Sequence, residues 1–162
     1  MKGKAGEYVA VCCFTGHRDL GGKDAEISKR LHLMVESCIV AGFNEFRVGG
    51  ALGFDTLAAE TVLKLREQYP AARLVVMVPC RDQDRAWSRE QKERYHAILQ
   101  TADEVKVLSE TYYRGCMFAR NRALVDGSEL CLAYLKGAGG TKMTVDYAKK
   151  QNVTVINIGD LI

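Results

Sequence analysis

A glycine-rich stretch, residues 136 to 141, has the residue types that bind phosphate and other anions, and it reads Lys-Gly-Ala-Gly-Gly-Thr. An apolar run, residues 129 to 135, precedes it, and a segment that ends in Lys149 and Lys150 follows, so the pattern predicts a buried strand, a turn and a helix. The first backbone N–H groups of a helix lack intrahelical partners and carry the positive end of its dipole, so an anion can dock on them. Glycine lets such a ligand approach the backbone closely. A tight turn without a ligand is the alternative interpretation.

The spacing of these glycines matches neither of two common phosphate-binding loops. A Rossmann fingerprint would need a third glycine at Lys142, and a Walker A loop would need Gly-Lys-Ser or Gly-Lys-Thr after four intervening residues. The prediction of a site therefore depends on whether other loops converge on this one.

Two further loops carry residue types that suit phosphate or ribose. The first is Thr15-Gly16-His17-Arg18, where the Arg18 guanidinium can pair with phosphate in a bidentate way. The second reads GGALGFDT over residues 49 to 56, and there Gly49, Gly50 and Gly53 would form a backbone cradle while Asp55 accepts hydrogen bonds from ribose hydroxyls. The alternatives are structural: His17 as a loop residue without a chemical role, and Asp55 or Thr56 as the N-cap of a helix.

Strand-like and helical segments alternate along the whole chain, which is the pattern of a parallel sheet covered by helices on both faces. The fold expected is α/β, a three-layer α/β/α Rossmann-like arrangement with a mainly parallel sheet, and residues 1–162 suit a single domain. Loops after parallel strands gather at one edge of the sheet, where open α/β folds bind ligands. The strands expected are residues 8–14, 45–48, 73–79, 104–108, 129–135 and 153–158, and the helices include one capped by Asp24, one after Thr56, one over 85–100 and one over 117–126.

Composition limits the classes of partner. Lys and Arg number 23 against 20 Asp and Glu, a net charge of only +3, which is too small to indicate nucleic-acid binding by itself. The six cysteines include no Cys-x-x-Cys spacing, so we expect buried reduced thiols and no metal site. Apolar runs are short and the first eight residues lack a signal-peptide pattern. We therefore expect no membrane span and a cytoplasmic location.

Further candidates for the site lie outside the glycine loops. Arg120 and Asn121 precede the fifth predicted strand, although both could simply face solvent. Trp87, the only tryptophan, and Tyr112 and Tyr113 are candidates to stack on a base, with core packing as the usual alternative.

Together these stretches resemble the YpsA-like branch of the SLOG superfamily, which unites DprA/Smf and Lonely Guy proteins. The resemblance rests on CCFTGHR, on GGALGFDTLAAE, on the region from Pro79 to Trp87, and on the segment from Cys116 to Thr141 with the VDYA that follows. Asp19 departs from the pattern, because the branch commonly has proline there. The resemblance implies a nucleotide-derived ligand, such as ADP-ribose, an NAD-like molecule or a cyclic nucleotide, and a possible homo-oligomer. The ligand residues implied are Thr15, Gly16, His17, Arg18, Gly49, Gly50, Ala51, Gly53, Asp55, Thr56, Trp87, Arg120, Asn121, Gly139, Gly140 and Thr141.

The resemblance also bears on catalysis. Lonely Guy phosphoribohydrolases carry a glutamate where this chain has Thr144, whereas Arg120 matches the enzymes' arginine. Because a threonine hydroxyl cannot replace the carboxylate as a base, we expect N-glycosidic hydrolysis to be weak or absent. The alternative is that Asp55 or Asp146 serves with the ligand in a different pose, together with Arg120. Two alternatives to a binding protein stay open: a phosphoribohydrolase-like hydrolase of nucleotides, and single-stranded nucleic-acid binding in the manner of DprA, against which the small net charge argues.

Overall fold

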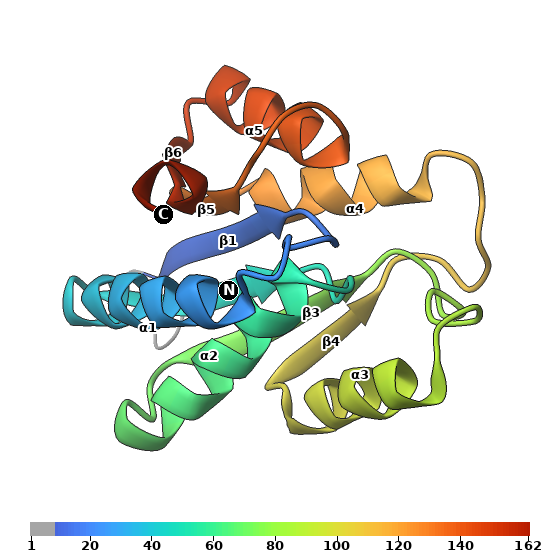
Figure 1. The fold of residues 1–162 in the computed structure, drawn as a ribbon, viewed down its shortest axis with the longest axis horizontal. Coiled ribbons are helices and arrows are strands. Elements are labelled where there is room, and N and C mark those ends of the chain that lie inside the picture. Colours follow the sequence, from blue (N-terminus) through green and yellow to red (C-terminus); the bar gives the residue numbers. More distant parts are fainter. Residues whose placement is uncertain (1–8) are drawn as a thin grey trace.

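A computed structural model describes residues 9–162, and its sheet holds six parallel strands in the order β4-β3-β2-β1-β5-β6 (Figure 1). This confirms the α/β Rossmann-like fold and the parallel sheet. The elements are β1 (Ala10–Gly16), α1 (Asp24–Val40), β2 (Phe43–Val48), α2 (Phe54–Gln68), β3 (Arg73–Val78), α3 (Arg89–Thr101), β4 (Glu104–Val107), α4 (Cys116–Val125), β5 (Leu130–Tyr134), α5 (Gly140–Lys150), β6 (Thr154–Asn157) and the 3-10 helix η1 (Ile158–Leu161).

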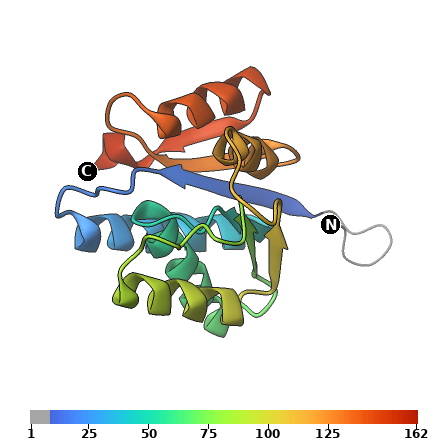
Figure 2. The same cartoon turned by 90° about the vertical axis from the view of Figure 1, so that its right-hand side faces the viewer.

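The helices form two layers, with α1, α2 and α3 on one face of the sheet and α4 and α5 on the other (Figure 2). Successive strand residues point to opposite faces, so Cys12 and Phe14 of β1 pack against the first layer while Cys13 between them packs against the second. Strand β1 is therefore apolar on both sides, as are its neighbour β5 and most of β3. This double burial explains the continuous apolar runs that predicted the strands.

The chain reverses its direction of travel across the sheet at β1, which pairs with β2 on one side and with β5 on the other. Strands β2, β3 and β4 follow one another outward, and the chain then crosses back to add β5 and β6. Neighbouring loops diverge to opposite faces at such a switch point, which leaves a crevice outside the carboxyl ends of the strands. The loops after β1, β2 and β5 meet there.

Several element boundaries differ from those expected. Helix α3 begins at Arg89 rather than Arg85, because Ser88 and Gln91 form a capping box in which each side chain bonds the other's backbone N–H. Asp24 is the first residue of α1 and its side chain makes no cap bond, so its expected role as cap was wrong. The expected start of the first strand at Tyr8 lies outside the described residues.

All six cysteines are buried free thiols, as expected from their apolar surroundings. Among residues 9–162, no cluster of three or more His, Cys, Asp and Glu side chains is placed to hold a metal ion. In the same part of the chain, none of the helices combines the length and the apolarity that crossing a bilayer requires.

Candidate functional site

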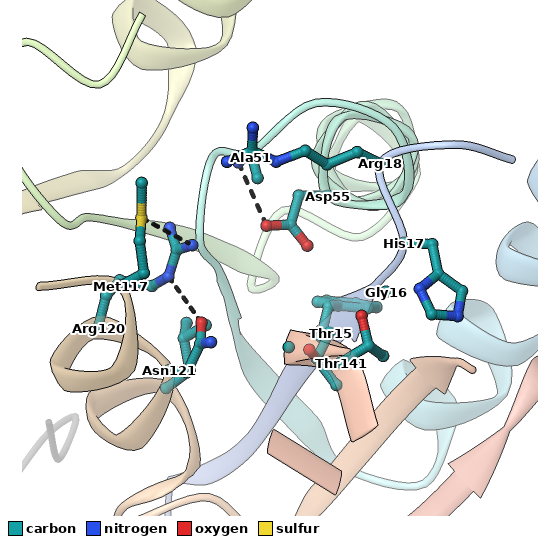
Figure 3. A pocket seen from close by; sticks show the side chains of 13 residues that line it. Thr15, Gly16, His17, Arg18, Ala51, Asp55, Met117, Arg120, Asn121 and Thr141 are labelled. Carbon is teal, nitrogen blue, oxygen red and sulfur yellow. Dashed lines mark hydrogen bonds between the residues drawn. The ribbon is translucent and has the colours of Figure 1, made fainter. Parts of the chain in front are cut away.

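A cavity of about 290 Å³, here called the central cavity, opens at the switch point between β1 and β5 (Figure 3). Its walls come from the loop after β1, the first turns of α2 and α5, and one face of α4, so segments far apart in the sequence meet there. The lining residues are Phe14, Thr15, Gly16, His17, Arg18, Ala51, Asp55, Met117, Arg120, Asn121, Leu124, Gly140 and Thr141.

The start of α5 forms one wall of the central cavity. Gly139 precedes the helix with φ 125°, a conformation that favours glycine, and no side chain caps the helix. A Cβ built on Gly140 would point into open space, away from the rest of the protein. The predicted anion site after the fifth strand thus has an open approach.

Two threonines line the central cavity beside this helix end. Thr15 and Thr141 are each only 7% exposed as whole residues. Neither hydroxyl makes a hydrogen bond within the described part of the chain, and neither is among the fully buried polar atoms without a partner, so both are accessible to a ligand. Figure 3 shows the two side chains close together below His17. A ligand oxygen between them would supply the missing partner.

Asp55 and Arg120 bring opposite charges to the buried part of the cavity, and they are 6% and 5% exposed. Burial raises the pKa of Asp55, and the nearby Arg120 and the Ala51 N–H, which donates to Asp55 Oδ2 at 3.2 Å, oppose that rise. Burial likewise lowers the pKa of Arg120, and Asp55 opposes this change. The described contacts include no direct ion pair between the two groups, so a polar ligand can lie between them.

Arg120 is held in position by the loop after β2. Its Nη1 donates to the carbonyl oxygen of Gly49, and its Nε donates to Asn121 Oδ1 at 2.9 Å. This arrangement explains why residue 49 is glycine, since a Cβ there would lie 2.6 Å from Nη1. Arg120 is 5% exposed, so the alternative that it simply faces solvent is wrong.

Arg18 is the exposed cation of the site. Its side chain extends over the cavity toward Ala51 (Figure 3), and it makes no hydrogen bond or ion pair with any described residue. Because a guanidinium can bind phosphate with two parallel hydrogen bonds, Arg18 is free to hold an anion at the cavity mouth.

His17 joins two loops that are 119 residues apart. Its Nε2 accepts a 2.7 Å hydrogen bond from the backbone N–H of Lys136, and its ring lies edge-on to Tyr134 at 6.0 Å. Nε2 is therefore engaged with the backbone, and only Nδ1 remains to donate to a ligand. These contacts give His17 a structural role, which is to connect the loop after β1 to the loop after β5.

The glycines of the loop after β2 serve packing. A Cβ on Gly49 would strike Arg120, one on Gly50 would lie 3.2 Å from Tyr95 and Val76, and one on Gly53 would strike the backbone of Arg18. None of these three glycines lines the cavity. The residues at this end of α2 that do line it are Ala51 and Asp55. Neither Asp55 nor Thr56 caps α2, because Asp55 accepts from Ala51 and the Thr56 hydroxyl donates to the Ala51 carbonyl.

Three of the residues considered above lie away from the central cavity. Thr144, at the position of the enzymes' glutamate, donates its hydroxyl to the Gly140 carbonyl inside α5. Asp146 lies on the exposed face of α5 in an ion pair with Lys142 at 2.7 Å, so it is not placed for catalysis in this cavity. Trp87 lines a second cavity on the other face of the sheet.

The apolar floor of the cavity, formed by Phe14, Met117 and Leu124, was not predicted from the sequence. Met117 and Leu124 flank Arg120 at helical spacing, so all three lie on the same face of α4. Placing Arg120 in the site would have been enough to predict the other two from this spacing.

The sequence matches the YspA SLOG family over residues 14–157. Among curated proteins it is 34% identical to a UPF0398 protein of Bacillus pumilus strain SAFR-032 over 111 residues, which are 67% of this chain and 58% of that protein. It is also 31% identical to the uncharacterized SPbeta prophage-derived protein YoqJ of Bacillus subtilis strain 168, over 77% of this chain and 81% of that protein. The chain thus spans little more than half of the first relative.

Two solved structures share the fold at low sequence identity. DNA processing protein A (DprA) from Streptococcus pneumoniae superposes with a TM-score of 0.66 at 18% identity, over 91% of this chain and 49% of that one. DprA from Helicobacter pylori, described for its single-stranded DNA binding mode, superposes with a TM-score of 0.63 at 16% sequence identity, over 90% of this chain and 63% of that one. These matches support the fold, and the match over residues 14–157 covers every loop of the central cavity, so the chain belongs to the YpsA-like branch of the SLOG superfamily.

Proposed function

We propose that the central cavity binds a phosphate-bearing nucleotide derivative such as ADP-ribose, an NAD-like molecule or a cyclic nucleotide. The observation that carries this proposal is the pair of hydroxyls, Thr15 and Thr141, that line the cavity beside the start of α5 and make no hydrogen bond within the described part of the chain. A phosphate accepts hydrogen bonds from hydroxyls and from free helix N–H groups alike, so it satisfies both at once. Arg18 adds a cation at the mouth.

The remaining walls suit the nucleoside part of such a ligand. Asp55 is the one carboxylate among the described residues that line the cavity, and an ionised carboxylate accepts hydrogen bonds from the two hydroxyls of a ribose. Phe14, Met117 and Leu124 provide an apolar floor for a ring. Arg120 and Asn121 also line the cavity and can donate to the ring or the ribose.

We infer binding rather than efficient hydrolysis of the glycosidic bond. Thr144 is neutral and its hydroxyl is engaged with Gly140, while Asp146 lies outside the cavity. A missing acid or base commonly costs ~10²–10⁴-fold in rate. Asp55 is the remaining carboxylate that could replace it, so turnover that disappears in Asp55→Asn would contradict this inference.

Isothermal titration calorimetry against AMP, ADP, ADP-ribose, NAD and cyclic nucleotides tests the proposal. We expect at least one phosphate-bearing compound to bind with one-to-one stoichiometry, and chromatography of the same mixtures to show no released base. Folded protein that binds none of them would contradict the proposal.

Single-stranded nucleic acid is a second candidate, favoured by a groove that continues from the central cavity past His17 and Arg18. This basic groove, about 630 Å³, is also lined by Lys23 and Lys136. The single-stranded DNA binding of Helicobacter pylori DprA gives a further reason to test it. Oligonucleotide binding that weakens steeply with salt, together with no binding of mononucleotides, would favour this candidate over the first.

A further inference from the structure

A second cavity of about 440 Å³ lies across Arg18 from the central cavity, between the loop after β1, the start of α2 and the helix α3. We call it the aromatic cavity, because Trp87 and Tyr95 form one of its walls. Arg18 lines both cavities. They also share the first turn of α2, where Asp55 faces the central cavity and its neighbour Thr56 faces the aromatic one.

The aromatic wall is held in place before any ligand binds. The Trp87 ring lies edge-on to Tyr95 with centroids 5.0 Å apart, and Gln83 donates to the Tyr95 hydroxyl at 3.2 Å. The turn that carries Trp87 ends in the Ser88 capping box of α3. Such preorganisation lowers the entropy cost of binding.

The charges of the aromatic cavity differ from those of the central one. Arg94 is neutralised by two hydrogen bonds to Glu60 at 2.6 and 2.7 Å, and Asp19 and Asp24 stand at the rim. Apart from Arg18, the cavity has no unpaired cation among its described lining residues. It therefore suits a neutral or cationic ring with hydroxyl or amino groups, not a phosphate.

We propose that the ligand is a dinucleotide-type molecule, in which phosphates at Arg18 join a nucleoside in the central cavity to a second ring-bearing unit that stacks on Trp87 in the aromatic cavity. This deepens the proposed function and rests on it. A single cation between a polar cavity and an aromatic cavity matches a ligand whose phosphates lie between two uncharged or cationic groups. A mononucleotide would fill the central cavity only.

Trp87 is the only tryptophan, so its fluorescence reports directly on the aromatic cavity. We expect NAD to change the emission of the wild-type protein, and AMP to bind with little change in emission. Calorimetry should show that Trp87→Ala weakens NAD binding by about tenfold or more, as loss of one stacked base does, whereas Trp87→Phe retains most of it. AMP affinity should change less than about threefold in both variants.

Tyr113→Ala is the matched control, because Tyr113 is 49% exposed and lines neither cavity. NAD that binds without any change in emission or any effect of Trp87→Ala would overturn the dinucleotide proposal and leave the proposed function standing. Equal weakening of NAD and AMP by Trp87→Ala would also overturn it, since the ring would then serve both ligands or only the fold. If no compound binds, both proposals fail.

Discussion

The guanidinium of Arg120 donates a hydrogen bond to the backbone carbonyl of Gly49, and the two residues are so close that a Cβ at position 49 would lie 2.6 Å from Nη1. This contact fixes the loop after β2 to α4 across the carboxyl edge of the sheet. It also leaves the remaining donors of Arg120 beside the central cavity.

Gly49→Ala should therefore displace Arg120 and damage both the fold and the site. Overpacking of this kind costs ~1–3 kcal/mol, which urea unfolding can measure. Ligand affinity should fall as well, because the guanidinium can no longer keep its place. A variant with wild-type stability and wild-type affinity would show that the contact is unimportant.

Thr15→Val and Thr141→Val test the two cavity hydroxyls at nearly constant volume. Each should weaken binding of a phosphate-bearing ligand, since a hydrogen bond to a charged group contributes ~1.5–3 kcal/mol. Stability should change little, because neither hydroxyl has a hydrogen-bond partner in the described part of the chain.

Thr61→Val is the control for these variants. Thr61 is similarly buried, at 8% exposure, but it does not line the central cavity. Its hydroxyl donates a hydrogen bond to the Leu57 carbonyl oxygen within α2. We expect unchanged affinity in this variant. Equal loss of affinity in all three would mean that the effect comes from the fold and not from the cavity.

Asp55 should give the protein a stability component that falls as the pH rises. Burial raises the pKa of Asp55 above its unfolded value, so between these two values the folded state holds a proton that the unfolded state has lost. The free energy of unfolding must therefore decrease from about pH 4 upward until the pH passes the raised pKa. Each unit of pKa difference corresponds to about 1.4 kcal/mol.

Asp55→Asn removes this titration, so its stability relative to wild type should increase over the same pH window. Urea unfolding of both proteins from pH 4 to 8 measures the difference. A constant difference across the window would show that Asp55 titrates as an ordinary exposed carboxylate.

The six thiols should react very unevenly with a disulfide reagent. Burial, with help from Asp82 and Cys116, raises the pKa of Cys80 to about 11, so its reactive thiolate is scarce at pH 8. Cys38 is 8% exposed and a hydrogen bond from Cys12 lowers its pKa, so it should react first. We expect one thiol to react early in the native protein, and this early reaction should be absent in Cys38→Ser. In denaturant all six thiols of the wild-type protein should react. Rapid reaction of several thiols in the native state would contradict the burial.

Much of the fold could be predicted because the local signals are strong. The valine-rich run over residues 73–78 and the alternation of strands with helices left little choice of architecture. The start of α3 was missed even though Ser88 and Gln91 have the capping-box spacing, since the charged residues before them extended the helical pattern.

The site was harder to predict, because its decisive contacts join residues that are distant in the sequence. No local pattern indicates that His17 binds the backbone of Lys136, or that Gly49 receives Arg120. Trp87 was predicted to stack on a base, but only the packing of α3 against α2 shows that it borders a separate cavity.

The central claim is that phosphate binds at the open start of α5, and Gly140→Ala tests it most directly. The added methyl group points into open space and Gly140 has no positive φ, so the fold should be kept. Calorimetry should compare AMP with adenosine in both proteins. The account predicts that wild type prefers AMP, and that Gly140→Ala loses most of this preference because the methyl group blocks close approach of the phosphate. Equal affinity of wild type for AMP and adenosine, or an undiminished preference in Gly140→Ala, would contradict it.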